Sequence, residues 1–113
     1  IVRAAMKNEL CRKILSTYQY TTAPTPQHPE GILLTSTLFS YMYGTEPEGA
    51  TVTAGKTGFT DQALNTLVTY TKIDGHEYVF VTMRGSTRWK ATYDCIDTFT
   101  RFCKDFAIPE PTE

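Results

Sequence analysis

The chain lacks several features that would assign it at once to a functional class. Its 11 Lys and Arg are balanced by 12 Asp and Glu, and the basic residues form no run. A nucleic-acid-binding surface needs a basic patch, so we expect no nucleic-acid partner. No apolar stretch approaches the ~18 residues of a membrane-spanning helix, and no signal peptide is recognisable.

Cysteine is also scarce, with three residues in 113. Cys95 and Cys103 fall in one predicted helix, where their spacing separates them by about 12 Å along the axis. A disulfide needs Cα atoms within roughly 7 Å, so we expect free thiols that pack as small apolar side chains. The C-x2-C spacing of zinc ligands is missing as well, and nothing else in the sequence indicates a metal or a cofactor.

Apolar residues make up 41% of the chain and aromatic residues 12%, which is enough to form the core of one domain or of part of one. The chain starts at Ile1, in a segment over residues 1–6 that already has the character of a helix. We therefore expect it to be a processed or truncated piece of a longer protein.

The first half of the chain carries one clear helical signal. Val2, Met6, Leu10 and Ile14 recur every four residues and predict an amphipathic helix over residues 2–16. Four weaker signals follow, namely β-prone residues at 18–22, a proline-rich loop at 23–31, an apolar segment at 32–42 that favours a short helix, and turn-forming residues at 43–49.

The second half predicts three strands and a helix. The strands are expected at residues 50–57, 64–72 and 76–83, with an Asp74-Gly75 hairpin turn between the last two. Because the connections are short, the strands should form an antiparallel sheet.

The helix is expected over residues 88–106, with the hydroxyl groups of Ser86 and Thr87 available to cap its start. Pro109 and Pro111 would end it. Its apolar stripe, which we expect to pack on the sheet, consists of Trp89, Tyr93, Ile96, Phe99, Cys103 and Phe106.

A cluster of one lysine, hydroxyl groups and two glycines occupies residues 54–61, in the order Ala-Gly-Lys-Thr-Gly-Phe-Thr-Asp. Such a cluster suits an anion, either phosphate or carboxylate. A phosphate-binding P-loop requires G-x4-G-K-[ST] and a helix immediately after it, but Ala50 stands where its first glycine should be. On a strand, Lys56 and Gly58 would share one face, and the glycine would leave room for a substrate backbone. The pattern therefore favours a carboxylate-binding strand.

Lys56, Thr57 and Gly58, hereafter the Lys-Thr-Gly motif, belong to the longer pattern Lys-Thr-Gly-x-Thr-x-x-Ala, which a hairpin and a helix follow. In these features the chain resembles the serine-type D-alanyl-D-alanine carboxypeptidases, which are low-molecular-mass penicillin-binding proteins. The resemblance implies an α+β fold of the β-lactamase and transpeptidase type. It also implies a five-stranded sheet, to which this chain would contribute three antiparallel strands, a packed C-terminal helix and an N-terminal helical segment.

The same resemblance implies a domain organisation. Residues 1–113 would be the C-terminal part of one such domain. Residues 1–49 would form its helical and irregular segment, and residues 50–107 its sheet and C-terminal helix.

Roles for individual residues also follow from the resemblance. Lys56 would act on the proton network of the nucleophile and on the substrate carboxylate, and the Thr57 hydroxyl would bind that carboxylate in a D-Ala-D-Ala peptide or a β-lactam. Gly58 would let the acyl chain lie antiparallel to the strand. The backbone N–H of Phe59 would be one of two oxyanion-hole donors, and losing one such donor can cost ~3 kcal/mol of transition-state stabilisation.

Two motifs of the family are absent. No serine is followed three residues later by lysine, and no Ser-x-Asn occurs. Both motifs would lie upstream of Ile1, so we expect the isolated chain to be inactive towards D-Ala-D-Ala substrates and penicillin. Arg84 and Arg88 are further candidates for carboxylate binding, although neither matches a position of the family.

The predicted function is thus part of an enzyme that trims peptidoglycan stem peptides through an acyl-enzyme, outside the cytoplasmic membrane of a bacterium. Two alternatives remain: a β-lactamase-related hydrolase, or a non-catalytic binding or scaffolding module. The expected partners are the D-Ala-D-Ala peptide or a β-lactam and the missing N-terminal half of the domain. The apolar strand over residues 76–83 should also pair with a strand from that half or from a second copy.

Overall fold

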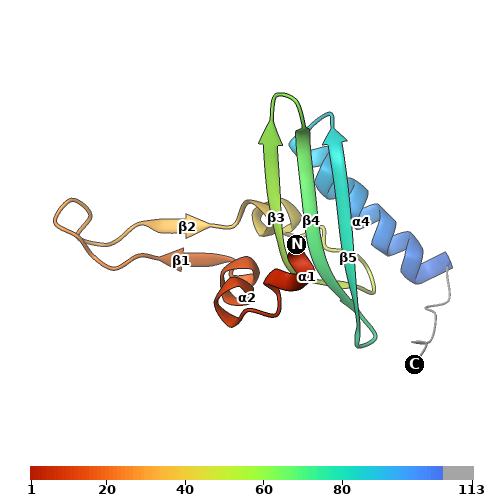
Figure 1. Ribbon diagram of the computed structural model, residues 1–113, viewed down its shortest axis with the longest axis horizontal. Helices are drawn as coiled ribbons and strands as arrows, with labels where there is room; N and C mark the ends of the chain where they lie inside the picture. The colour runs from red at the N-terminus through yellow and green to blue at the C-terminus, as the bar shows by residue number, and fades with distance from the viewer. Residues whose placement is uncertain (106–113) are drawn as a thin grey trace.

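The computed structural model describes residues 1–105 and confirms the predicted α+β fold (Figure 1). Strands β3 (Thr51–Thr60), β4 (Leu64–Ile73) and β5 (His76–Gly85) form an antiparallel sheet in the order β3-β4-β5. Helix α4 (Arg88–Asp105) packs on one face of β4 and β5. Within residues 1–105, no helix is long and apolar enough to cross a bilayer.

The turn between β4 and β5 agrees with the sequence prediction. Asp74 and Gly75 have φ values of 48° and 81°, and the two-residue turn that best matches the strand twist needs positive φ at both positions. All three strands extend beyond their predicted ranges. β3 continues to Thr60, for example, because its last residues pair in register with the first residues of β4 as far as Leu64.

The hydrophobic core lies between β4 and two helices, α4 and α3 (Thr37–Met42), and α3 contributes the buried Leu38 and Met42. Alternate residues of β4 point towards the helix, and the buried ones are Leu67, Thr69, Thr71 and Ile73. From α4, the buried residues Ala91, Cys95 and Phe99 face them. The hydroxyl groups of Thr69 and Thr71 lie 3.3 Å apart, and that of Thr69 lies 3.6 Å from the Cys95 sulfur. The polar atoms in this core therefore have partners within the protein.

The single helix predicted over residues 2–16 is wrong, because the structure divides it into two. Helix α1 spans Val2–Ala5 and helix α2 spans Glu9–Ser16. Asn8 separates them, since its backbone is extended and its side chain accepts a hydrogen bond from the Cys11 N–H at 3.0 Å. An asparagine in this position is an N-cap, so it begins α2 rather than continuing α1.

The predicted apolar stripe of this segment is buried only in part. Met6 is 8% exposed, whereas Leu10 and Ile14 are 66% and 65% exposed. Helix α2 contacts β3 rather than the core between β4 and α4. Its apolar residues therefore line an open groove instead of the core.

An arm formed by residues 19–35 projects from the body of the protein (Figure 1). Its strands β1 (Gln19–Thr21) and β2 (Leu33–Thr35) pair antiparallel, and the proline-rich loop lies between them as predicted. The short helix that the sequence favours within residues 32–42 is confirmed in the second part of that segment. Pairing with β1 keeps β2 extended, and helix α3 forms only over Thr37–Met42.

Helix α4 begins as predicted, because the Thr87 hydroxyl accepts a hydrogen bond from the Lys90 N–H at 3.0 Å. The prediction that Trp89 and Tyr93 pack on the sheet is wrong. The Trp89 and Tyr93 side chains are 44% and 48% exposed, and their rings stack on each other. The centres of the Trp89 ring and of the Tyr41 ring of α3 lie 4.4 Å apart.

The physical reason is that α4 meets the sheet through smaller side chains. Ala91 and Cys95 are 3% and 0% exposed, and their small volume allows close approach of the helix. The large rings of Trp89 and Tyr93, at the start of the helix, are therefore not covered by the sheet and stay partly exposed. Phe106, the last residue of the predicted stripe, and the predicted helix stops Pro109 and Pro111 lie outside the described residues.

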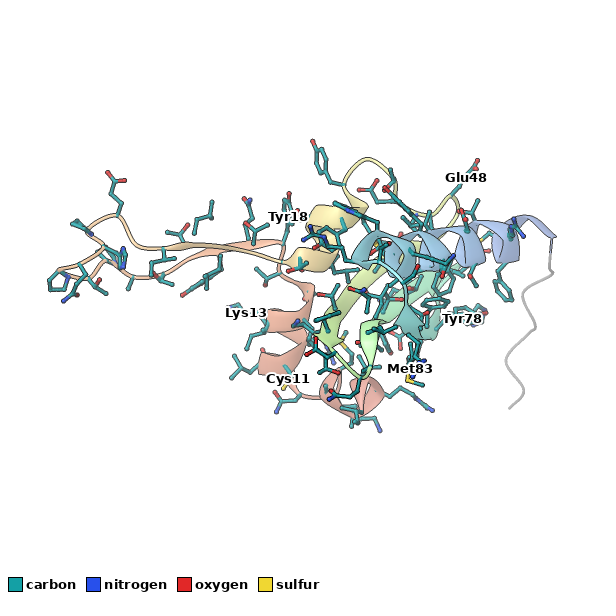
Figure 2. The ribbon with its side chains drawn as sticks, turned by 90° about the horizontal axis from the view of Figure 1, so that it is seen from above. Cys11, Lys13, Tyr18, Glu48, Tyr78 and Met83 are labelled. Atoms are coloured by element: carbon teal, nitrogen blue, oxygen red, sulfur yellow. The ribbon has the colours of Figure 1, made fainter. Side chains whose placement is uncertain are left out.

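Strand β5 forms one edge of the sheet, and within residues 1–105 no strand pairs with its outer side. Its residues alternate, so that Tyr78 lies on the side of α4 and Met83 on the opposite side (Figure 2). On that opposite side, Val79, Val81 and Met83 are 39%, 60% and 73% exposed. The pairing of this apolar edge with a further strand stays a prediction.

The buried Cys95 thiol leads to a testable pH dependence. Burial raises its pKa from 9.0 to about 11, because the thiolate would lose its hydration. Since the folded-state pKa exceeds the unfolded one, the corresponding stabilisation is complete below pH 9 and is lost as the pH rises towards 11. We expect the free energy of unfolding, measured in urea across this range, to fall more steeply for the native chain than for Cys95→Ala.

The three cysteines are free, and Cys11 is exposed. Cys11 serves as an internal control for the burial of Cys95. Iodoacetamide should modify Cys11 in the folded chain, but it should modify Cys95 only after unfolding. Equal pH slopes for the native chain and Cys95→Ala, or equal alkylation rates at the two thiols, would contradict this account.

Candidate functional site

The Lys-Thr-Gly motif lies in the middle of β3 and pairs with β4 throughout. Lys56 is opposite Val68, and Gly58 is opposite Thr66. The motif is therefore part of a regular strand, without the irregular loop and following helix of a P-loop. β4 pairs with one side of β3, and within residues 1–105 no strand pairs with the other.

The strand sends alternate residues of the motif to opposite faces of the sheet. Lys56 and Gly58 share one face, as the sequence predicts, and Gly55 and Thr57 share the other. Lys56 is exposed, and its ammonium donates a hydrogen bond to the Thr57 carbonyl at 2.6 Å. Thr57 is half-buried, and Phe59 is 63% exposed.

The two glycines beside Lys56 have different neighbours. A Cβ atom on Gly55 would lie 2.4 Å from Leu38 Cδ2 and 2.6 Å from the Val68 carbonyl oxygen. Gly55 thus permits close packing of α3 and β4 around the motif. A Cβ atom on Gly58 would meet the Thr66 hydroxyl at 2.7 Å, with no other heavy atom within 4 Å. This second glycine leaves the surface of β3 open.

A groove of about 550 Å³ lies beside the motif. Gly55, Lys56 and Thr57 form its β3 wall, and the other walls come from α2, the base of the arm and the start of α3. Its large apolar side chains include Leu10, Ile14, Tyr20 and Leu34. The sequence prediction missed the contribution of these residues, although the four-residue spacing of Leu10 and Ile14 had marked them as one face of a helix.

The groove is electropositive. Its charged lining residues are Lys13 and Lys56, and no Asp or Glu is among the residues that line it. Within residues 1–105, no group of three or more His, Cys, Asp or Glu side chains could hold a metal ion. The arrangement can therefore bind an anionic ligand with an apolar part, and carboxylate is one such anion.

Arg84 and Arg88, the further candidates from the sequence, do not line the groove. Arg84 lies near the end of β5, and β4 stands between β5 and the motif strand. The Arg88 guanidinium lies 5.8 Å from the centre of the Trp89 ring. The structure therefore does not bring these arginines together with Lys56.

No protein-family model matches the chain, and no curated protein matches it. Two similar solved structures are a D-alanyl-D-alanine carboxypeptidase from Mycobacterium tuberculosis H37Rv, with 26% identity and a TM-score of 0.59, and a penicillin-binding protein homologue from Mycobacterium tuberculosis, with 25% identity and a TM-score of 0.60. The matches cover 86% and 85% of this chain, and 37% and 36% of those chains.

The chain therefore has a fold related to that of the penicillin-binding hydrolases. More particularly, the resemblance to D-alanyl-D-alanine carboxypeptidases that the Lys-Thr-Gly motif predicted is confirmed. The chain spans little more than a third of the length of the structures that it matches.

The surroundings of the two glycines predict different costs of substitution. Gly55→Ala should lower the free energy of unfolding by about 1–3 kcal/mol, because the new methyl group would overlap a backbone carbonyl that cannot rotate away. Gly58→Ala should cost less, since only the Thr66 side chain has to move. Urea unfolding of the two variants measures this difference, and equal losses would show that the packing around Gly55 is not as described.

Proposed function

We propose that the chain is part of a serine D-Ala-D-Ala carboxypeptidase domain that trims peptidoglycan stem peptides through an acyl-enzyme. The observation that carries this proposal is the position of the Lys-Thr-Gly motif on β3, whose unpaired side adjoins an electropositive groove. A peptide can add to such a strand side as one more extended segment. Its terminal carboxylate would then lie beside a lysine and a threonine hydroxyl.

Each site residue receives a role in this proposal. The Thr57 hydroxyl donates a hydrogen bond to the terminal carboxylate, and Lys56 attracts the same anion and acts on the proton network of the nucleophile. Gly58, which has no side chain to obstruct the strand, lets the acyl part lie antiparallel to β3. The Phe59 N–H serves as one of two oxyanion-hole donors, where a single donor contributes ~3 kcal/mol to catalysis.

The nucleophile comes from outside this chain in our proposal, because the sequence contains no Ser-x-x-Lys. Residues 1–113 would be the C-terminal part of one domain, and its remaining part would supply the nucleophile. That part would also supply a strand for the apolar outer side of β5, with self-association through the same edge as the alternative. Peptidoglycan as substrate implies a location outside the cytoplasmic membrane.

Two other functions use the same strand and groove. A β-lactamase-related hydrolase would differ by a carboxylate in the remaining part of the domain that activates water for deacylation. A non-catalytic binding or scaffolding module would keep the carboxylate-binding strand without a Ser-x-x-Lys in any part of the protein. The exposed Lys56 in the groove supports the non-catalytic alternative, because this lysine can bind a ligand carboxylate without taking part in catalysis.

Peptide binding tests the proposal directly. The ligand is acetyl-Gln-D-Ala-D-Ala, which carries one carboxylate, and its dissociation constant is measured by NMR titration of the 113-residue chain. Thr57→Val should weaken binding about tenfold or more, because a hydrogen bond to a charged group is lost. Thr51→Val is the matched control, since this exposed residue of the same strand does not line the groove.

A second measurement addresses the nucleophile. Fluorescent penicillin should leave the isolated chain without a covalent label, as judged by gel fluorescence and intact mass. A covalent adduct would contradict the assignment of the nucleophile to another part of the domain. Equal peptide affinities for Thr57→Val and Thr51→Val would contradict the carboxylate site itself.

A further inference from the structure

A second cavity, of about 380 Å³, lies beside the start of β3 and the end of α3. It shares Tyr18 with the groove beside the Lys-Thr-Gly motif, and within residues 1–105 the two linings have no other residue in common. We propose that this cavity, hereafter the aromatic pocket, binds a small organic cation with a quaternary ammonium group. The proposal goes beyond the proposed function and does not depend on it, because Lys56 and Thr57 do not line the aromatic pocket.

Three aromatic side chains line the aromatic pocket. Tyr18 lies where the arm joins the body of the protein (Figure 2), Phe39 lies in α3, and Tyr43 directly follows α3. The rings of Tyr18 and Phe39 are nearly perpendicular, with an interplanar angle of 87° and centres 6.5 Å apart. Two perpendicular rings form a corner, so a compact group placed there is close to the faces of both. The face of an aromatic ring is negative and attracts a cation that lies within about 6 Å of the ring centre.

The charge of the aromatic pocket has the sign that a cationic ligand requires. Glu46 is the one charged residue among the described residues that line it. Glu46 is exposed, and neither of the ion pairs found within residues 1–105, Lys72–Glu77 and Lys90–Asp94, involves it. A ligand cation therefore meets a carboxylate for which no lysine or arginine of the lining competes.

The rest of the lining favours a quaternary ammonium group over an ammonium group that carries hydrogen atoms. Met42 is buried, and Ala50 and Val52 are half-buried, so the less exposed part of the lining is apolar. A primary ammonium group has three N–H donors, and each of them needs an acceptor when water is removed. A quaternary ammonium group has no donor, and its methyl groups can contact apolar side chains and aromatic faces alike.

The test compares two ligands of the same shape. Choline carries a trimethylammonium group, and in its neutral carbon analogue a tert-butyl group replaces that group. Their dissociation constants for the full chain are measured by NMR titration at low salt. The native chain should bind choline about three- to tenfold more tightly, as expected of partly exposed cation–π contacts and one exposed ion pair. The amide signals of Phe39 and Val52 should shift on binding, and that of Lys56 should not.

Three variants address the two sources of attraction. Glu46→Gln should lower the affinity for choline about two- to fivefold and leave the affinity for the carbon analogue unchanged. Tyr43→Leu should act in the same direction, because leucine keeps an apolar surface but has no aromatic face. Tyr43→Phe should restore the native preference. Tyr43 is 77% exposed, so these substitutions leave the core intact.

Two controls accompany these measurements. Glu30→Gln removes the same charge from an exposed residue of the arm that does not line the aromatic pocket, and it should keep the preference for choline. Ethanolamine, whose ammonium group carries hydrogen atoms, should bind more weakly than choline.

Several results would overturn the proposal. Equal affinities of the native chain for choline and its carbon analogue would do so, and so would the absence of choline binding. A preference that survives in both Glu46→Gln and Tyr43→Leu would show that the cation binds elsewhere. Ethanolamine that binds as tightly as choline would contradict the choice of a quaternary ammonium group.

Discussion

The antiparallel pairing of β3 with β4 is the constraint on which the site depends. A shift of one residue in this register would exchange the faces of every residue in the motif. In the observed register, Gly55 faces Leu38 and Lys56 faces away from it, beside the groove. A register irregularity between Val52 and Ala54 precedes the motif, so the pairs from Ala54 onward set its orientation.

Close packing on one face of β3 and openness on the other arise from the same pair of glycines. Gly55 lets the Leu38 side chain and the Val68 carbonyl approach, and this contact anchors α3 against the motif strand. Gly58 keeps the opposite face clear. Gly55 and Leu38 also line the groove, so the packed part of the fold directly borders the candidate binding surface and gives the motif a rigid support.

The groove combines elements that are far apart in sequence. Helix α2 and the arm bring apolar side chains and Lys13 to the side of β3 that pairs with no strand. The other edge of the sheet, at β5, also pairs with no strand within residues 1–105, and β5 exposes Val79, Val81 and Met83 on the face opposite α4. An unpaired side of this kind suits a further strand, whereas the side at β3 suits a shorter extended ligand with a carboxylate. In the proposed function both sides are used, one for assembly and one for substrate.

The sequence alone determined the sheet, its hairpin, the start of α4 and the strand position of the Lys-Thr-Gly motif, because local signals such as Asp74-Gly75 and the Thr87 cap agree with the fold. Tertiary structure decided the rest. The four-residue spacing of Leu10 and Ile14 could not reveal that Asn8 starts a new helix, nor that this helix borders a groove. Residues 33–35 became a strand because β1 pairs with them. Side chains distant in sequence come together only after folding, so the presence of Lys13 and Lys56 in one groove has no local signature.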